Sequence, residues 1–239
     1  MDYMGEHIID LDILQSDTLF KHPERICVYG SSGSGKTSFV VDLVKKYQDS
    51  FHKIILCGQG NKLLDFKETS KKTKLHRPKS SSDEIFNPFN EFKIHELKKY
   101  KRQVLLIYDD LQEVIFNSPI ISKIFSQGRH RGFSVILLLQ TYFPGGSGGK
   151  TLMPQIRANC TIQIFLKGSS YSEIGVVASK LTHGKSDREY FLSLFKDLVA
   201  DARYGYLAVL MNPSDPRLSY VNNLLNEDDF PFMTVHIKS

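Results

Sequence analysis

The segment GSSGSGKT at Gly30–Thr37 carries the residue types that bind the phosphates of a nucleotide. It fits the pattern G-x4-G-K-[ST] at every fixed position, directly after an apolar run. Glycines let the backbone curl so that successive N–H groups point at phosphate oxygens, and a helix beginning there adds the positive end of its dipole. Lys36 would then reach the β- and γ-phosphates, and the Thr37 hydroxyl would bind Mg²⁺. The alternative is a Gly/Ser-rich loop that matches by chance. The nucleotide contacts that we expect are Gly30, Ser31, Ser32, Gly33, Ser34, Gly35, Lys36, Thr37 and Ser38.

A second segment, PGGSGGKTL at residues 144–152, also ends in Gly-Lys-Thr. Pro144 stands where the pattern requires glycine. The preceding apolar run ends four residues earlier, so no strand adjoins the segment, and Pro154 lies where a helix should begin. We therefore expect a flexible loop there, and phosphate binding only at Gly30–Thr37.

Two adjacent carboxylates, Asp109 and Asp110, follow the apolar run VLLIY. In a hydrolytic nucleotide site the first carboxylate holds Mg²⁺ through water, and the second orients or deprotonates the attacking water. The metal ligands that we expect are therefore Thr37 and Asp109. The alternative is that the acid pair caps the helix that follows it.

Gln140 ends the next apolar run, FSVILLL. In a parallel sheet it would lie beside the phosphate loop, where an amide could bind both the γ-phosphate and the attacking water. A polar residue that merely ends a strand is the alternative. Arg129 and Arg131 precede the same strand and belong to the opposite edge of the sheet. They could serve a neighbouring subunit's nucleotide, or they could be solvated basic residues.

These residues need a sheet to bring them together. Continuous apolar runs alternate with segments of helical periodicity, which predicts an α/β fold with a mostly parallel sheet covered on both faces. The expected strands are Arg25–Tyr29, Lys53–Cys57, Val104–Tyr108, Phe133–Leu139, Thr161–Leu166 and Tyr204–Met211. The expected helices are Lys36–Tyr47, Leu111–Gln127, Ser170–Leu181 and Asp187–Val199. Residues 58–100 read as surface loops around short helices, and the chain ends in a polar tail.

The composition adds few constraints. No window approaches the ~18 apolar residues of a membrane span, and the acidic N-terminal segment is unlike a signal peptide, so we expect no secretion. A net charge of +5 is compatible with a polyanionic partner but also common without one. Cys27, Cys57 and Cys160 lie in or beside apolar runs and are expected to be reduced, buried thiols. The densest basic cluster, within residues 71–79, is expected to be a solvated loop rather than a DNA grip.

The ordered set GSSGSGKT, LLIYDD, GRH, SVILLLQTYF and IRANC resembles the viral genome-packaging ATPases of the FtsK–HerA superfamily, in the poxvirus, virophage and Polinton-type branch. The resemblance covers about residues 20–215. Its most specific parts are Gly128-Arg129-His130, Gln140-Thr141-Tyr142 and Arg157-Ala158-Asn159. It implies one P-loop ATPase domain of the ASCE/RecA-like type over 1–239, with residues 1–20 as an N-terminal segment and 212–239 as a C-terminal tail.

The resemblance also implies roles. ATP and Mg²⁺ would be the cofactors, Lys36, Asp109, Asp110 and Gln140 would act in catalysis, and Arg129 would be the arginine finger, with Arg157 as a second candidate. The expected partners are double-stranded DNA, further copies of the chain in a ring of five or six, and a capsid or vertex protein. The expected location is the host cytoplasm or a viral factory, with virion association as a further option.

Two points stay open at this level. A small-molecule kinase could use the same loop, although it does not need a glutamine after the acid pair; a GTP switch is excluded because the sequence lacks a usable N-K-x-D motif. Gly145–Pro154 lengthens a connection that is short in the poxvirus-type pattern. This loop could move with the nucleotide state and bring Lys150 to a DNA phosphate, or it could be a spacer.

Overall fold

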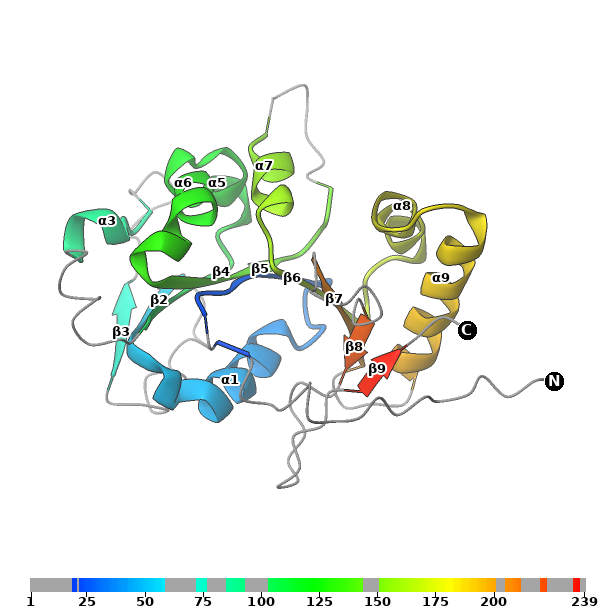
Figure 1. Cartoon of the computed structure of the whole chain (residues 1–239), viewed down its shortest axis with the longest axis horizontal. Helices are drawn as coiled ribbons and strands as arrows, with labels where there is room; N and C mark the ends of the chain where they lie inside the picture. Colours follow the sequence, from blue (N-terminus) through cyan, green and yellow to red (C-terminus); the bar gives the residue numbers. More distant parts are fainter. Residues whose placement is uncertain are drawn as a thin grey trace.

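A twisted sheet runs through the whole molecule in the computed structural model (Figure 1). The structure describes residues 19–20, 22–58, 72–76, 85–92, 103–143, 151–200, 205–211, 220–222 and 234–236. Across these residues the sheet has nine strands in the order β3-β2-β4-β5-β1-β6-β7-β8-β9. The strands are β1 Arg25–Tyr29, β2 Phe51–Gly58, β3 Thr73–His76, β4 Gln103–Asp109, β5 Phe133–Leu139, β6 Ile162–Leu166, β7 Tyr206–Leu210, β8 Tyr220–Asn222 and β9 Thr234–His236.

Every pairing from β3 across to β6 is parallel, and the pairings from β6 to β9 are antiparallel. This confirms the expected mostly parallel sheet. Strand β5 lies between β1 and β4, with Val28 beside Leu138 and Ile107 beside Ile136. The carboxyl ends of β1, β4 and β5 therefore meet at one edge of the sheet, which is where the phosphate loop, the acid pair and Gln140 follow them.

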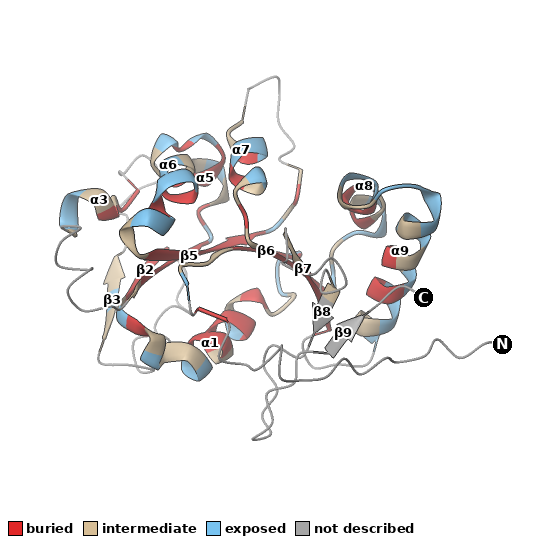
Figure 2. Ribbon diagram, viewed as in Figure 1, coloured by how far each residue is buried: buried red, intermediate tan, exposed pale blue. Residues whose placement is uncertain are grey.

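Helices cover both faces of the sheet, as predicted (Figure 1). Helix α1 lies on one face of the sheet, and its apolar residues pack on the side chains that the parallel strands turn toward that face. The remaining α-helices lie on the other face over a second core. Figure 2 shows the buried residues along the sheet and on the helix faces turned toward it. The helices are α1 Lys36–Tyr47, α3 Pro88–Glu91, α5 Gln112–Asn117, α6 Pro119–Gln127, α7 Met153–Ala158, α8 Tyr171–Leu181 and α9 Lys185–Ala200, with 3-10 turns η3 Gln48–Ser50 and η4 Gly128–Arg131.

The helix predicted over Leu111–Gln127 is two helices, so that prediction was wrong. Ser118 has an extended backbone (φ −82°, ψ 113°), and its side chain accepts a hydrogen bond from the Ile121 amide at the start of α6. Pro119 enforces the break, since a residue before proline avoids the helical region and proline suits the first helical turn. Apolar periodicity continued across the break and concealed it.

Three short strands were also missed. Strand β3 lies in the segment predicted as loops and short helices, and β8 and β9 lie in the predicted polar tail. Each has only three or four residues, which is too short for an alternating pattern to stand out. They form because a neighbouring strand edge offers unpaired backbone groups, and that edge exists only in the folded chain.

Helix α7 corrects the interpretation of Pro154. The proline was taken as evidence against a helix after PGGSGGKTL, yet it lies in the first turn of α7, where its missing N–H has no intrahelical partner to lose. Strand β5 does end at Leu139, as expected. The segment 144–150, the N-terminal segment to residue 18 and the acidic patch near 226–229 lie outside the described residues. So do Lys71, Arg77 and Lys79 of the basic cluster, whereas its residues 72–76 are described.

All three cysteines are free and buried. The Cys27 and Cys160 sulfurs are 3.1 Å apart, within hydrogen-bonding distance. Burial raises the pKa of the Cys57 thiol and that of the Cys160 thiol well above the ordinary range. These are structural thiols, as expected. In the part of the chain that the structure describes, no helix is both long and apolar enough to cross a membrane.

Candidate nucleotide site

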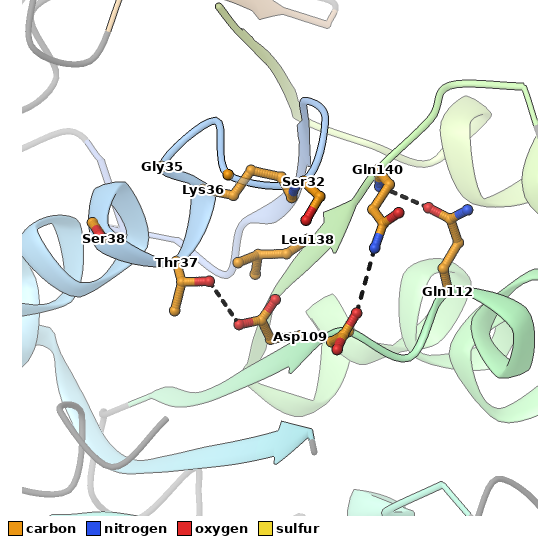
Figure 3. Close-up of a pocket in the computed structure, with 11 residues that line it drawn as sticks. Ser32, Gly35, Lys36, Thr37, Ser38, Asp109, Gln112, Leu138 and Gln140 are labelled. Carbon is orange, nitrogen blue, oxygen red and sulfur yellow. Dashed lines mark hydrogen bonds between the residues drawn. The ribbon is translucent and has the colours of Figure 1, made fainter. Parts of the chain in front are cut away.

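One pocket lies at the carboxyl edge of β1, β4 and β5 (Figure 3). It is bounded by the phosphate loop with the start of α1, by the acid pair and by the end of β5. The residues that line it are Ser32, Gly33, Gly35, Lys36, Thr37, Ser38, Asp109, Asp110, Gln112, Leu138 and Gln140. The structure thus brings together side chains from three segments that are separate in sequence, at residues 32–38, 109–112 and 138–140.

The phosphate loop has the backbone that the glycines were expected to allow. Gly33 and Gly35 have positive φ angles of 78° and 92°, in the left-handed region that favours glycine. Gly35 immediately precedes α1, and no side chain caps the first turn of that helix. Gly35 and the first-turn residues Lys36, Thr37 and Ser38 line the pocket. A helix start without a side-chain cap suits the binding of an anion through backbone N–H groups.

Lys36 is folded back into the loop. Its ammonium donates to the carbonyl oxygens of Gly30 at 2.6 Å and Ser31 at 2.9 Å. Burial lowers the pKa of this ammonium, while the nearby carboxylates of Asp109 and Asp110 oppose the decrease. The ammonium is thus held at the pocket wall by neutral acceptors that a phosphate oxygen could replace.

Thr37 and Asp109 meet across the pocket floor. The Thr37 hydroxyl donates to the Asp109 carboxylate at 2.9 Å, as the dashed line in Figure 3 shows. Asp109 is buried, and this burial raises its pKa; the bond from Thr37 lowers it and the charge of Asp110 raises it further. A buried carboxylate beside a hydroxyl is a set of hard oxygen donors of the kind that Mg²⁺ prefers.

Asp110 lies in the pocket with an unusual backbone. Its φ angle is 57°, in the left-handed region, which aspartate enters more readily than most residues. Its exposed carboxylate accepts a bond of 3.4 Å from the Gln140 side-chain amide. The strand end thus directs Asp109 to Thr37 and Asp110 to Gln140. The two carboxylates have separate partners, as two separate roles would require.

Gly30, Ser31 and Ser34 do not line the pocket. The Gly30 amide donates to the Leu139 carbonyl at 3.1 Å and continues the β1–β5 pairing. A Cβ at Gly30 would come within 2.6 Å of the Ser34 hydroxyl oxygen, so a side chain there would collide with the loop. Gly30 therefore supports the loop's shape.

The sequence did not single out Gln112. Its side-chain oxygen accepts hydrogen bonds from the backbone N–H of Gln140 at 2.7 Å and from that of Thr141 at 3.3 Å. Its place two residues after the acid pair was the only signal available. A polar residue at the start of a helix is too common to be informative.

The three arginines differ in their surroundings. Arg129 is exposed in η4, at the opposite edge of the sheet from the pocket. The Arg131 guanidinium lies over the Phe89 ring, 5.1 Å from its centroid. Arg157 donates to the Tyr142 carbonyl at 2.7 Å and lies over the ring of the same tyrosine. Arg131 and Arg157 thus have contacts within their own chain.

The model of the poxvirus A32 protein family matches residues 82–160, about a third of the chain. Over these residues the chain is similar to the poxvirus A32 proteins. This confirms the resemblance inferred from the motifs, and the matched part contains the acid pair, Gln140 and the GRH and RAN triplets. A DNA packaging protein of Variola virus is 28% identical over 141 residues, which are 53% of this chain and 49% of that protein. The chain thus spans about half the length of this curated relative.

Solved structures share the fold. The genome packaging NTPase B204 of Sulfolobus turreted icosahedral virus 2, in complex with AMPPCP, superposes with a TM-score of 0.55 at 17% identity, covering 79% of this chain and 93% of that one. The cytoplasmic domain of EssC superposes with a TM-score of 0.50 at 13% identity, covering 91% of this chain and 41% of that one. At these identities the likeness shows the fold alone, which is that of the P-loop NTPases, as predicted.

Proposed function

We propose that this chain is an ATPase domain that packages viral double-stranded DNA, working as a ring of identical subunits. The observation that carries the proposal is the pocket in which the phosphate loop, the acid pair and Gln140 converge. Relatedness to the A32 proteins and to a Variola virus DNA packaging protein supports the packaging role. Such a protein would act in an infected cell, in the cytoplasm or a viral factory, and would dock on a capsid or vertex protein.

The proposed chemistry follows from the chain's own groups. Lys36 would exchange its two carbonyl partners for the β- and γ-phosphate oxygens of ATP, and the start of α1 would bind the same phosphates through backbone N–H groups. Asp110 would accept the proton of the attacking water, and the Gln140 amide beside it would orient that water. Thr37 and Asp109 would hold Mg²⁺, which supplies positive charge to the phosphate oxygens.

Arg129 is the residue that we propose as the finger in trans. Its exposure and its position away from its own pocket leave it available to a neighbour, whereas Arg157 contacts Tyr142 within the chain. Positive charge from Arg129 also opposes the burial that raises the pKa of the Glu24 carboxyl.

Mixing two inactive variants tests the finger. Arg129→Ala protein keeps its phosphate loop, and Lys36→Ala protein keeps its arginine, so roughly a quarter of the interfaces in randomly mixed head-to-tail rings would be intact. Because an arginine in trans contributes ~10³–10⁵ in rate, the mixture should hydrolyse ATP much faster than either variant alone.

Light scattering with an ATP analogue and DNA first identifies conditions that give a pentamer or hexamer. Arg131→Ala is the matched control and should be active by itself. An absence of recovery in assembled rings would reject Arg129 as the finger.

DNA dependence tests the packaging role. Double-stranded DNA should stimulate phosphate release, and the DNA concentration for half-maximal stimulation should rise at least ~10-fold between about 50 and about 200 mM salt, because each neutralised phosphate releases counterions. The rate without DNA, measured over the same salt series, separates DNA binding from effects of salt on catalysis. A salt-independent response, or none, would favour a small-molecule kinase.

A further inference from the structure

The segment Gln140–Phe143, called here the sensor segment, continues the chain after β5 has ended. It makes no strand pairing, so its backbone N–H groups need other acceptors. All four of its amides donate to side-chain oxygens. Gln112 takes the first two, at 2.7 and 3.3 Å.

Glu173, in the first turn of α8, takes the other two. One carboxylate oxygen accepts from the Tyr142 amide, from the Phe143 amide at 3.4 Å and from the Thr141 hydroxyl at 2.6 Å. Glu173 is 31 residues from Tyr142 in sequence, so only the fold brings them together. Its charge strengthens these bonds, because hydrogen bonds to an ionised acceptor are about twice as strong as neutral ones.

Arg157 and the core hold the far end of the sensor segment. Arg157 donates to the Tyr142 carbonyl, and the Tyr142 ring lies 5.1 Å from that of Tyr29 on β1 and 6.0 Å from that of Phe165 on β6. Tyr142 is buried. The segment is thus fixed along its backbone and anchored beside the strand that leads into the phosphate loop.

Helix α8, which carries Glu173, also begins close to the phosphate loop. Gly168, between β6 and α8, has a φ of 90°, and a Cβ there would lie 2.7 Å from the Ser31 hydroxyl oxygen. The connection therefore packs directly on the loop before α8 delivers Glu173 to the sensor segment.

We propose that Glu173 and Gln112 are positioning residues, which hold the backbone of the sensor segment so that the side-chain amide of Gln140 points at Asp110. The hydrogen bonds from the sensor segment to Gln112 and Glu173 are called here the clamp. The role assigned to Gln140 rests on the proposed function, whereas the clamp rests on the contacts above. Gln112 links the sensor segment to the acid pair, and Glu173 links it to α8. Without Glu173 the Tyr142 amide loses its acceptor, whereas the Phe143 amide keeps the Thr141 hydroxyl at 3.2 Å and that hydroxyl keeps the Phe143 carbonyl at 2.9 Å. The segment that carries the Gln140 side chain is then held less firmly.

The kinetic test replaces Glu173 by alanine. The kcat for ATP hydrolysis should fall about 10- to 100-fold, as expected for a misplaced catalytic group, while the KM for ATP changes less than about 2-fold. Glu173→Gln keeps an acceptor oxygen and should lose less. The matched control is Glu189→Ala on α9, where an exposed glutamate pairs only on the surface with Lys185. A Glu173→Ala enzyme with wild-type kcat would overturn the proposal.

A double variant shows whether Glu173 acts through Gln140. If it does, Gln140→Ala combined with Glu173→Ala should be no slower than Gln140→Ala alone, because the positioned group is already gone. Losses that multiply would mean that Glu173 acts elsewhere and would overturn the proposal.

Hydrogen exchange tests the clamp without ATP. In Glu173→Ala the Tyr142 amide should exchange at least ~10-fold faster than in the wild type and in Glu189→Ala, while the amides of β4 stay protected and report an intact fold. Unchanged exchange at Tyr142 would overturn the clamp. If the wild-type chain does not hydrolyse ATP, the proposed function fails, while the exchange experiment still confirms or rejects the clamp.

Discussion

Replacing Lys36 by alanine is expected to lower the kcat for ATP hydrolysis at least ~100-fold, the loss typical for removing one transition-state charge contact. The ammonium is buried at the pocket wall, 2.6 and 2.9 Å from two carbonyl oxygens that phosphate oxygens would replace. Burial lowers its pKa, but the carboxylates of Asp109 and Asp110 favour the charged form. Phosphate release under saturating ATP measures the effect.

Lys45→Ala is the matched control for this variant. Lys45 lies on the same helix, is exposed and pairs only weakly with Asp42, so its loss should leave kcat unchanged. Circular dichroism should show equal helix content in both variants, because Lys36 makes its two bonds to the loop rather than to the core. If Lys36→Ala hydrolysed ATP at the wild-type rate, the assignment of Gly30–Thr37 to the active site would be wrong.

Replacing Asp110 by asparagine should also reduce kcat at least ~100-fold, because a general base contributes ~10²–10⁴ in rate. Binding of ATP should change little, since Asp110 contacts Gln140 and the Thr37–Asp109 pair remains. A fluorescent ATP analogue gives the dissociation constant, and single-turnover kinetics gives the chemical step. A large loss of binding with an unchanged chemical step would contradict the assignment.

Asparagine is the informative replacement because of the backbone at this position. The φ of Asp110 is 57°, and asparagine tolerates the left-handed region about as well as aspartate, whereas alanine would add strain. The asparagine side-chain oxygen can also still accept the bond from Gln140. Glu113→Gln, at an exposed position three residues later, controls for the loss of one negative charge near the pocket.

The features that could be predicted from the sequence are those that depend on residues close together along the chain. The bounds of β1 and α1 agree with the predicted ranges because an apolar strand, a glycine-rich turn and helical periodicity follow one another without interruption. The acid pair and Gln140 were placed at one sheet edge by a rule of parallel sheets, and the structure places them in one pocket. Their catalytic roles remain predictions, which the variants above test.

The sequence by itself determined the phosphate loop, the parallel core strands and the residues that end them, because each depends on neighbours within a few positions. Only the tertiary structure decided the short edge strands and the clamp on the sensor segment; the break before Pro119 has a local cause, the proline, which the continuing apolar periodicity concealed. Gln112 and Glu173 are ordinary polar residues at helix starts, and nothing beside them in sequence distinguishes them. They matter because the segment after β5 has four amides without strand partners, and all four donate to side chains on helices 28 to 31 residues away.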